Sequence, residues 1–176
     1  MNNFFPILYL SIIIILLLMF SIMLSAQLID FYIKNRIYKA LSNKIIINEN
    51  RLSIAEYYQL SCICVYNNLL YEAIDRLQTG IKNSNSTSKD YLYNNYTLLA
   101  NVYEKLNQLT LAIKYYNNAL NIYDDNSLIL KKLASLYSQQ KNFHKVSEIY
   151  QQILLYEPDN YDIQVKLKKV TDILRY

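Results

Sequence analysis

The sequence is poor in the residues that make tight turns and in those that most often carry out catalysis. It has one glycine, two prolines, no tryptophan and one histidine in 176 residues. Because glycine and proline punctuate turns and hairpins, their scarcity favours an all-α chain. We find no glycine-rich phosphate loop, no paired-histidine metal motif, and no serine or cysteine nucleophile near a histidine. The sequence therefore predicts no enzyme, no catalytic residue, no metal site, no cofactor and no small-molecule substrate.

Two further shortages exclude other classes of site. Cys62 and Cys64 are two residues apart in a predicted helix, where their side chains diverge and cannot form a normal disulfide. The single histidine, His144, is too far along the chain to complete a metal site with them. Cations and anions are nearly balanced from residue 51 onward, whereas nucleic-acid binding needs a concentrated basic face. We therefore predict no nucleic-acid partner.

Charge is also missing from the start of the chain, where residues 4–26 read FFPILYLSIIIILLLMFSIMLSA. This run is longer than the roughly 20 residues with which a helix crosses a bilayer. The alternative is a cleaved signal peptide, but that requires a cationic start, a shorter apolar core and a small-residue cleavage site. We predict a transmembrane helix at 4–26. The cations that follow it place the rest of the chain on the side of synthesis: Lys34, Arg36, Lys39 and Lys44.

The residues after the apolar run are predicted to form a stem and a linker over 27–53. Ile33, Ile37 and Leu41 are four apart, which indicates an amphipathic continuation of the helix. Residues 42–50 are interpreted as the end of that helix and a linker. Ser53 and Glu56 then match a capping box at the start of a new helix.

Two later segments superimpose on each other at a spacing of 34 residues. Leu99, Ala100, Tyr103, Tyr116, Leu120, Asp125 and Asn126 recur as Leu133, Ala134, Tyr137, Tyr150, Leu154, Asp159 and Asn160. A fixed 34-residue period that joins two helical patterns by a short turn resembles the tetratricopeptide repeat family. The resemblance implies repeats at 54–87, 93–126 and 127–160, an insertion at 88–92 and a capping helix at 161–176. The expected fold is thus all-α, with a transmembrane helix followed by a three-repeat α-solenoid and its cap.

The family resemblance also implies a concave protein-binding groove formed mainly by the first helix of each repeat. Carried over position by position, the groove residues are Tyr58, Cys62, Val65, Asn94, Thr97, Asn101, Glu104, Lys105, Lys131, Ser135, Ser138 and Gln139. Each of these could equally be part of a solvated helix face. Tyr58 and Cys62 stand where relatives that clamp a chaperone C-terminus have Lys and Asn, so capture of such a tail is disfavoured. An extended segment or a helix of another protein remains open.

The whole arrangement of one N-terminal span, three repeats and a small chain resembles the plastid-encoded tetratricopeptide repeat proteins of algae that assist photosystem I assembly. The resemblance implies a single-pass protein of the thylakoid membrane, with a lumenal N-terminus and stromal repeats. Its partners would be photosystem I subunits or assembly intermediates, and residues 4–26 would contact the membrane. Two alternatives stay open: a general adaptor anchored in a bacterial or mitochondrial membrane, and a permanent subunit of a membrane complex.

Overall fold

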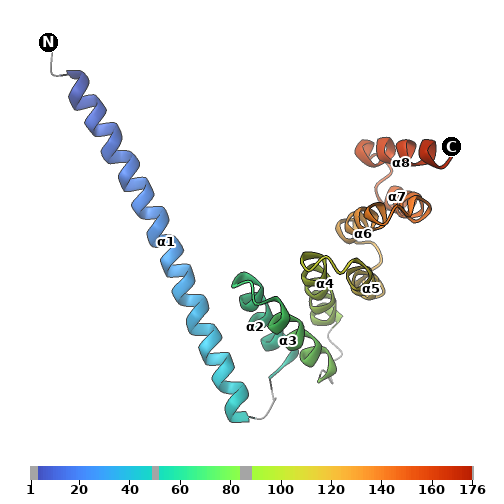
Figure 1. Ribbon diagram of the computed structural model, residues 1–176, viewed down its shortest axis with the longest axis horizontal. Coiled ribbons are helices and arrows are strands. Elements are labelled where there is room, and N and C mark those ends of the chain that lie inside the picture. Colours follow the sequence, from blue (N-terminus) through green and yellow to red (C-terminus); the bar gives the residue numbers. More distant parts are fainter. Residues whose placement is uncertain (1–3, 49–51, 84–88, 176) are drawn as a thin grey trace. The chain divides into compact units, whose positions relative to one another are not determined.

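The computed structural model describes residues 4–48, 52–83 and 89–175, and these residues are all-α. They divide into two compact units, residues 1–51 and 52–176. The first unit contains one helix, α1, and the second contains seven (Figure 1). In chain order the helices are α1 (Phe4–Asn48), α2 (Ile54–Tyr66), α3 (Leu70–Lys82), α4 (Lys89–Lys105), α5 (Leu109–Leu120), α6 (Ser127–Gln139), α7 (Phe143–Tyr156) and α8 (Tyr161–Leu174).

Helix α1 is a single uninterrupted helix of 45 residues. At 1.5 Å per residue it is about 67 Å long, roughly twice the thickness of the hydrocarbon core of a bilayer. Large apolar side chains are exposed along it from Leu8 to Ile33. The hydroxyls of Ser11 and Ser25 donate to carbonyl oxygens one turn earlier, at 2.7 and 2.9 Å, so these polar groups are satisfied within the helix. Helix α1 is therefore long and apolar enough to cross a membrane.

Helix α1 ends at Asn48, within the interval 42–50 that was predicted to hold the end of the helix and a linker, and residues 49–51 lie outside the described residues. Residues 42–48 (SNKIIIN) contain neither glycine nor proline, so nothing in the backbone chemistry stops the helix at Ser42. The amphipathic spacing of Ile33, Ile37 and Leu41 did correctly indicate that the helix extends past residue 26.

The second unit is built from three successive helix pairs and a final helix (Figure 1). The pairs are α2 with α3, α4 with α5, and α6 with α7, and α8 packs on α7. The inter-repeat insertion predicted at 88–92 is helical where the structure describes it, because residues 89–92 form the first turn of α4. This segment (KDYL) lacks a helix breaker, so the extra residues lengthen the helix.

Polar side chains cap several of these helices, among them the Ser53 and Glu56 pair that the sequence predicts. Ser53 and Glu56 form a reciprocal capping box, in which Glu56 Oε2 accepts from the Ser53 amide at 2.9 Å. Asn126 and Asn160 accept from backbone amides three residues later, at 3.0 and 3.2 Å. Such caps satisfy donors that have no partner within the helix, and each contributes roughly 1 kcal/mol.

Small residues let the helices approach, and tyrosines fill the space between them. Ala100, Ala112, Ala119 and Ala134 are all buried, as is Tyr116, while Tyr137 and Tyr150 are half-buried against the same core. This core runs continuously from Leu77 to Val170. Because each repeat buries its apolar face on its neighbours, the three repeats depend on one another for stability.

Gly80 allows α3 to lie close against Tyr57 of α2. A Cβ atom added at Gly80 would lie 2.8 Å from Tyr57 Cβ, which is closer than real side chains come. Alanine in a helix gains about 1 kcal/mol over glycine, but overpacking of this kind costs roughly 1–3 kcal/mol. We expect Gly80→Ala to lower the free energy of unfolding, and Gly80→Val to lower it further. Urea unfolding followed by circular dichroism checks this, with the half-buried neighbour Thr79→Ala as the control. A Gly80→Ala variant more stable than the parent would contradict the close approach.

Lys141 has a left-handed backbone conformation in the turn between α6 and α7. Its φ is 57°, and the corresponding turns of the earlier pairs have Asn68 at 60° and Asn107 at 57°. Asparagine tolerates this conformation, whereas lysine is strained there by about 1 kcal/mol. We expect Lys141→Asn to raise the free energy of unfolding and the reciprocal Asn107→Lys to lower it by a similar amount. Changes of the same sign in the two variants would refute the shared turn geometry.

Candidate protein-binding groove

The first helices of the three pairs border an open hollow of about 490 Å³, which we call the central hollow. One side chain comes from α2, four come from α4 and one comes from α6. Its lining residues are Val65, Leu98, Asn101, Glu104, Lys105 and Lys132. The hollow thus combines apolar walls with charges of both signs.

Glu104 is the centre of the polar contacts at the central hollow. It accepts from Lys132 Nζ at 3.1 and 3.2 Å, which links α4 to α6. The buried Tyr116 hydroxyl lies 2.8 Å from Glu104 Oε2 and 2.6 Å from Asn101 Oδ1, so its single proton is shared between two acceptors. Burial, reinforced by the bond to Glu104, raises the pKa of Tyr116 far above its usual value. The tyrosine is therefore a permanent donor, and it holds Glu104 at the hollow.

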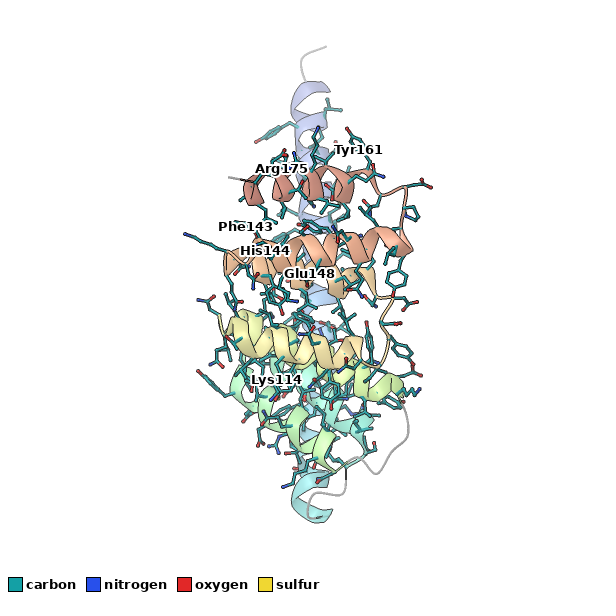
Figure 2. The ribbon with its side chains drawn as sticks, turned by 90° about the vertical axis from the view of Figure 1, so that its right-hand side faces the viewer. Lys114, Phe143, His144, Glu148, Tyr161 and Arg175 are labelled. Atoms are coloured by element: carbon teal, nitrogen blue, oxygen red, sulfur yellow. The ribbon has the colours of Figure 1, made fainter. Side chains whose placement is uncertain are left out.

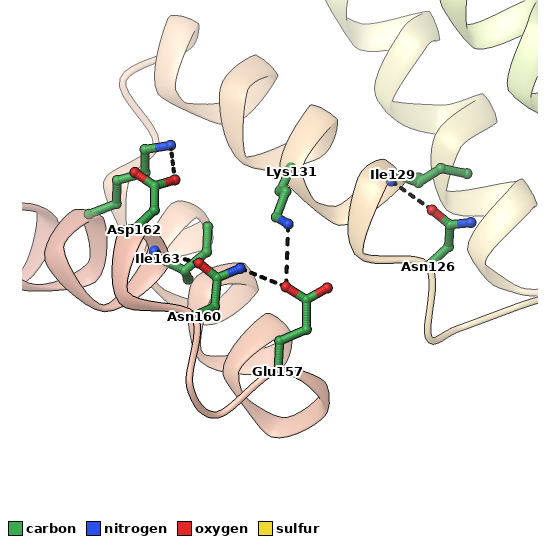
Figure 3. A network of polar contacts seen from close by, with 8 residues as sticks. Asn126, Ile129, Lys131, Glu157, Asn160, Asp162 and Ile163 are labelled. Atoms are coloured by element: carbon green, nitrogen blue, oxygen red, sulfur yellow. Dashed lines mark hydrogen bonds and ion pairs between the residues drawn. The ribbon is translucent and has the colours of Figure 1, made fainter.

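A second hollow of about 350 Å³, the C-terminal hollow, lies among α6, α7 and α8. Its lining residues are Lys131, Ser135, Ser138, Gln139, Tyr150, Ile163 and Lys166. Both cations on its border are held by carboxylates. Lys131 Nζ lies 3.3 Å from Glu157 Oε2, and Lys166 Nζ lies 2.6 Å from Asp162 Oδ2 (Figure 3). The other polar side chains that α6 contributes to this hollow are uncharged. They offer neutral hydrogen-bonding groups to a ligand.

One amide organises the edge of the C-terminal hollow. Asn160 Oδ1 caps α8 through the Ile163 amide at 3.2 Å, and its Nδ2 donates to Glu157 Oε2 at 2.6 Å (Figure 3). The neighbouring Ser127 hydroxyl and the Asn160 amide lower the pKa of Glu157, with a further contribution from Lys131. Glu157 is therefore ionised at neutral pH and keeps Lys131 in place beside the hollow.

The structure brings eight of the twelve predicted groove residues to these two hollows. Four line the central hollow (Val65, Asn101, Glu104 and Lys105), and four line the C-terminal hollow (Lys131, Ser135, Ser138 and Gln139). The other four, Tyr58, Cys62, Asn94 and Thr97, are half-buried on α2 and α4 and line neither hollow. The Thr97 hydroxyl is buried and has no hydrogen-bond partner among the described residues.

Sequence reasoning missed five lining residues. Leu98 and Lys132 lie beside predicted groove positions on α4 and α6, so helix spacing alone could have suggested them. Tyr150, Ile163 and Lys166 come from α7 and α8. No periodicity in the sequence gives the angle at which α8 packs on α7, so its contribution to a hollow was not predictable.

The two cysteines are free, and their thiols are poor nucleophiles. Burial raises the pKa of Cys62, and burial with the nearby Glu72 carboxylate raises the pKa of Cys64 to about 11. Both thiols are therefore protonated at neutral pH. His144 is exposed on α7 (Figure 2), and no cluster of metal-ligating side chains occurs in the part of the chain that the structure describes.

Comparisons with known proteins agree with this architecture. A family model described as tetratricopeptide repeat matches residues 93–126. A protein named ycf37 from Guillardia theta is 31% identical over 117 residues, which cover 66% of this chain and 65% of that protein. The ycf37 protein of Porphyra purpurea is 28% identical over 156 residues, covering 85% of this chain and 87% of its own. The chain therefore contains a match to the tetratricopeptide repeat at residues 93–126 and is similar to proteins named ycf37.

Solved structures show the same fold at low sequence identity. A crystal structure of MamA has a TM-score of 0.61 at 16% identity and covers 77% of this chain and 75% of its own. YrrB, described as a tetratricopeptide protein with an unusual peptide-binding site, has a TM-score of 0.60 at 15% identity, covering 80% and 71%. The first repeat domain of Spaghetti (RPAP3), bound to an HSP90 peptide, has a TM-score of 0.54 at 17% identity, covering 70% and 97%. At these identities the likeness shows the shared fold.

Proposed function

We propose that this chain is a membrane-anchored scaffold that holds photosystem I subunits or their intermediates during assembly, on the stromal side of the thylakoid. The single observation that carries the proposal is one chain combining an apolar helix long enough to span a bilayer with a three-repeat protein-binding fold. Its relatives named ycf37 are plastid-encoded proteins of algae, which supports a plastid setting.

The charge distribution along α1 supports the proposed topology. Its exposed apolar stretch has no charged residue before Asp30, whereas Lys34, Arg36 and Lys39 follow within the same helix. Cations stay on the side where the chain is made, so the repeats would be stromal and the N-terminus lumenal. Asp30 pairs with Lys34 at 2.5 Å, which leaves a net positive charge on this turn and the next.

The two hollows are suited to a segment of another protein. They are open, they alternate apolar walls with hydrogen-bonding groups, and most of their charges are already paired. An extended chain or a helix presents this mixture of partners, whereas a compact ion would be attracted to one sign of charge. The half-buried Tyr58 and Cys62 supply no cation, so the first repeat offers no clamp for a terminal carboxylate.

Tethering explains how a groove of modest affinity could assist assembly. Confinement to the membrane where subunits arrive raises the effective concentration of the groove for them by orders of magnitude without adding a contact. Release then remains fast, because no single contact is strong. A scaffold of this kind is expected to be scarce relative to the finished complex.

Deletion of the gene and complementation test the proposal. The deletion strain should accumulate less photosystem I while other thylakoid complexes persist. The parent sequence should restore it, and so should Gln151→Trp, which adds bulk at an exposed position of α7 outside both hollows. Ser135→Trp, which fills the C-terminal hollow, should fail. Normal photosystem I in the deletion strain under every light regime would refute the proposal. A protein stoichiometric with mature photosystem I would indicate a permanent subunit.

A further inference from the structure

A third hollow of about 230 Å³ lies among α3, α4 and α5, and we call it the outer hollow. It shares no lining residue with the central or the C-terminal hollow. The side chains that give it chemical character are Gln78, Lys82, Tyr96, Lys114, Tyr115 and Asn118. It is therefore a separate feature from the groove.

Stacked tyrosines make one side of the outer hollow rigid and apolar. The Tyr115 ring stacks on Tyr103 with centroids 5.4 Å apart and planes 2° apart, and on Tyr96 at 6.3 Å and 26°. Gln78 Nε2 donates to the Tyr103 hydroxyl at 3.2 Å, which ties α3 to this stack. Aromatic faces held in this way provide a ready contact for an apolar side chain, at little cost in entropy.

Two lysines at the outer hollow have no carboxylate partner within residues 4–48, 52–83 and 89–175. Lys82 and Lys114 are exposed, and neither takes part in an ion pair among the described residues. Lys114 Nζ lies 5.7 Å from the centre of the Tyr115 ring, and Figure 2 shows this residue on α5. No acidic side chain lines the hollow, and α5 itself (LTLAIKYYNNAL) contains none. The hollow is thus cationic, in contrast to the charge-paired groove.

This chemistry selects among possible ligands. Two unpaired lysines repel a cation, and the rings stack in parallel and do not form a box around one. An anionic lipid headgroup would engage the lysines but would leave the tyrosine face without an apolar partner. A segment that offers both a carboxylate and an apolar side chain satisfies both features. We propose that the outer hollow binds a protein segment in which an aromatic or aliphatic side chain lies next to acidic residues.

The proposal is tested on the full chain in phosphatidylcholine nanodiscs, with a fluorescently labelled peptide containing the sequence Asp-Phe-Asp. Peptides with Asn-Phe-Asn and with Asp-Gly-Asp remove the charge and the ring in turn. The decisive variant is Lys82→Glu with Lys114→Glu. The matched control is Lys168→Glu with Lys169→Glu, two exposed lysines of α8 outside the three hollows. Ser135→Trp fills the C-terminal hollow, and it therefore distinguishes binding at the outer hollow from binding at the groove.

We expect saturable binding of the Asp-Phe-Asp peptide that falls roughly tenfold in the Lys82/Lys114 variant and is unchanged in the control and in Ser135→Trp. The two altered peptides should bind more weakly. Absence of saturable binding, equal binding of Asn-Phe-Asn, or loss on Ser135→Trp would overturn the proposal. So would an effect of the two lysines confined to nanodiscs that contain phosphatidylglycerol. The complementation test of the groove and the peptide-binding test of the outer hollow can each succeed when the other fails. The two proposals are therefore independent.

Discussion

Deletion of residues 4–26 is expected to transfer the protein from the membrane to the soluble fraction. These residues carry the uncharged part of α1, where large apolar side chains such as Leu16, Met19 and Ile22 are about two-thirds exposed. Each buried methylene contributes about 0.8 kcal/mol, so a spanning helix of this composition is anchored in effect irreversibly. Fractionation followed by carbonate extraction measures the change. Replacing 4–26 by an unrelated apolar run of equal length should retain the protein on the membrane.

The same deletion should leave the repeats folded, because the second unit has its own continuous core. Circular dichroism of the soluble product should show a helical protein with a cooperative thermal transition. A deleted protein that stays on the membrane after carbonate treatment would contradict the account of α1 as the anchor. That result would mean that the remaining part of α1, or the repeats themselves, bind the membrane.

Tyr116→Ala is expected to cause a large loss of stability. The side chain is 1% exposed and belongs to the continuous core of the second unit. Truncating a buried aromatic costs about 3–5 kcal/mol, a large part of the 5–15 kcal/mol that holds a typical domain together. Urea unfolding measures it. Tyr156→Ala is a suitable control, because Tyr156 is 46% exposed.

Tyr116→Phe separates the ring from its hydroxyl. The ring still fills the core, but Glu104 and Asn101 lose the donor they share. We expect a smaller loss, about 1–3 kcal/mol, together with a weakened link between Glu104 and Lys132. Equal stability of the Phe variant and the parent would show that the hydroxyl does not organise the central hollow.

Much of the fold was predictable from local patterns. The 34-residue period aligns positions that are buried in both repeats, such as Ala100 with Ala134 and Leu99 with Leu133. The capping box of Ser53 and Glu56 marks a helix start that the structure confirms. These signals are local, so each follows from backbone chemistry within one or two turns.

The exact helix ends and the lining of the hollows were not predictable from the sequence. The lining of the hollows depends on packing between helices. The end of α1 was placed only to within residues 42–50, and the start of α4 was placed at Tyr93 instead of Lys89, because helix propagation needs no signal of its own. The contribution of Lys166 to the C-terminal hollow depends on how α8 lies against α7. The outer hollow depends on three tyrosines from α4 and α5 stacking, which neither helix specifies alone.

Site-specific photocrosslinking in thylakoid membranes tests the central claim most directly. A photoreactive residue at Ser135, on the C-terminal hollow, is compared with one at Glu148, an exposed position of α7 outside the three hollows (Figure 2). The account predicts crosslinks from position 135 to photosystem I subunits, enriched when assembly is in progress, and few from position 148. The account would be contradicted if position 135 gave no crosslinks to photosystem I, or if the two positions gave equal yields of them.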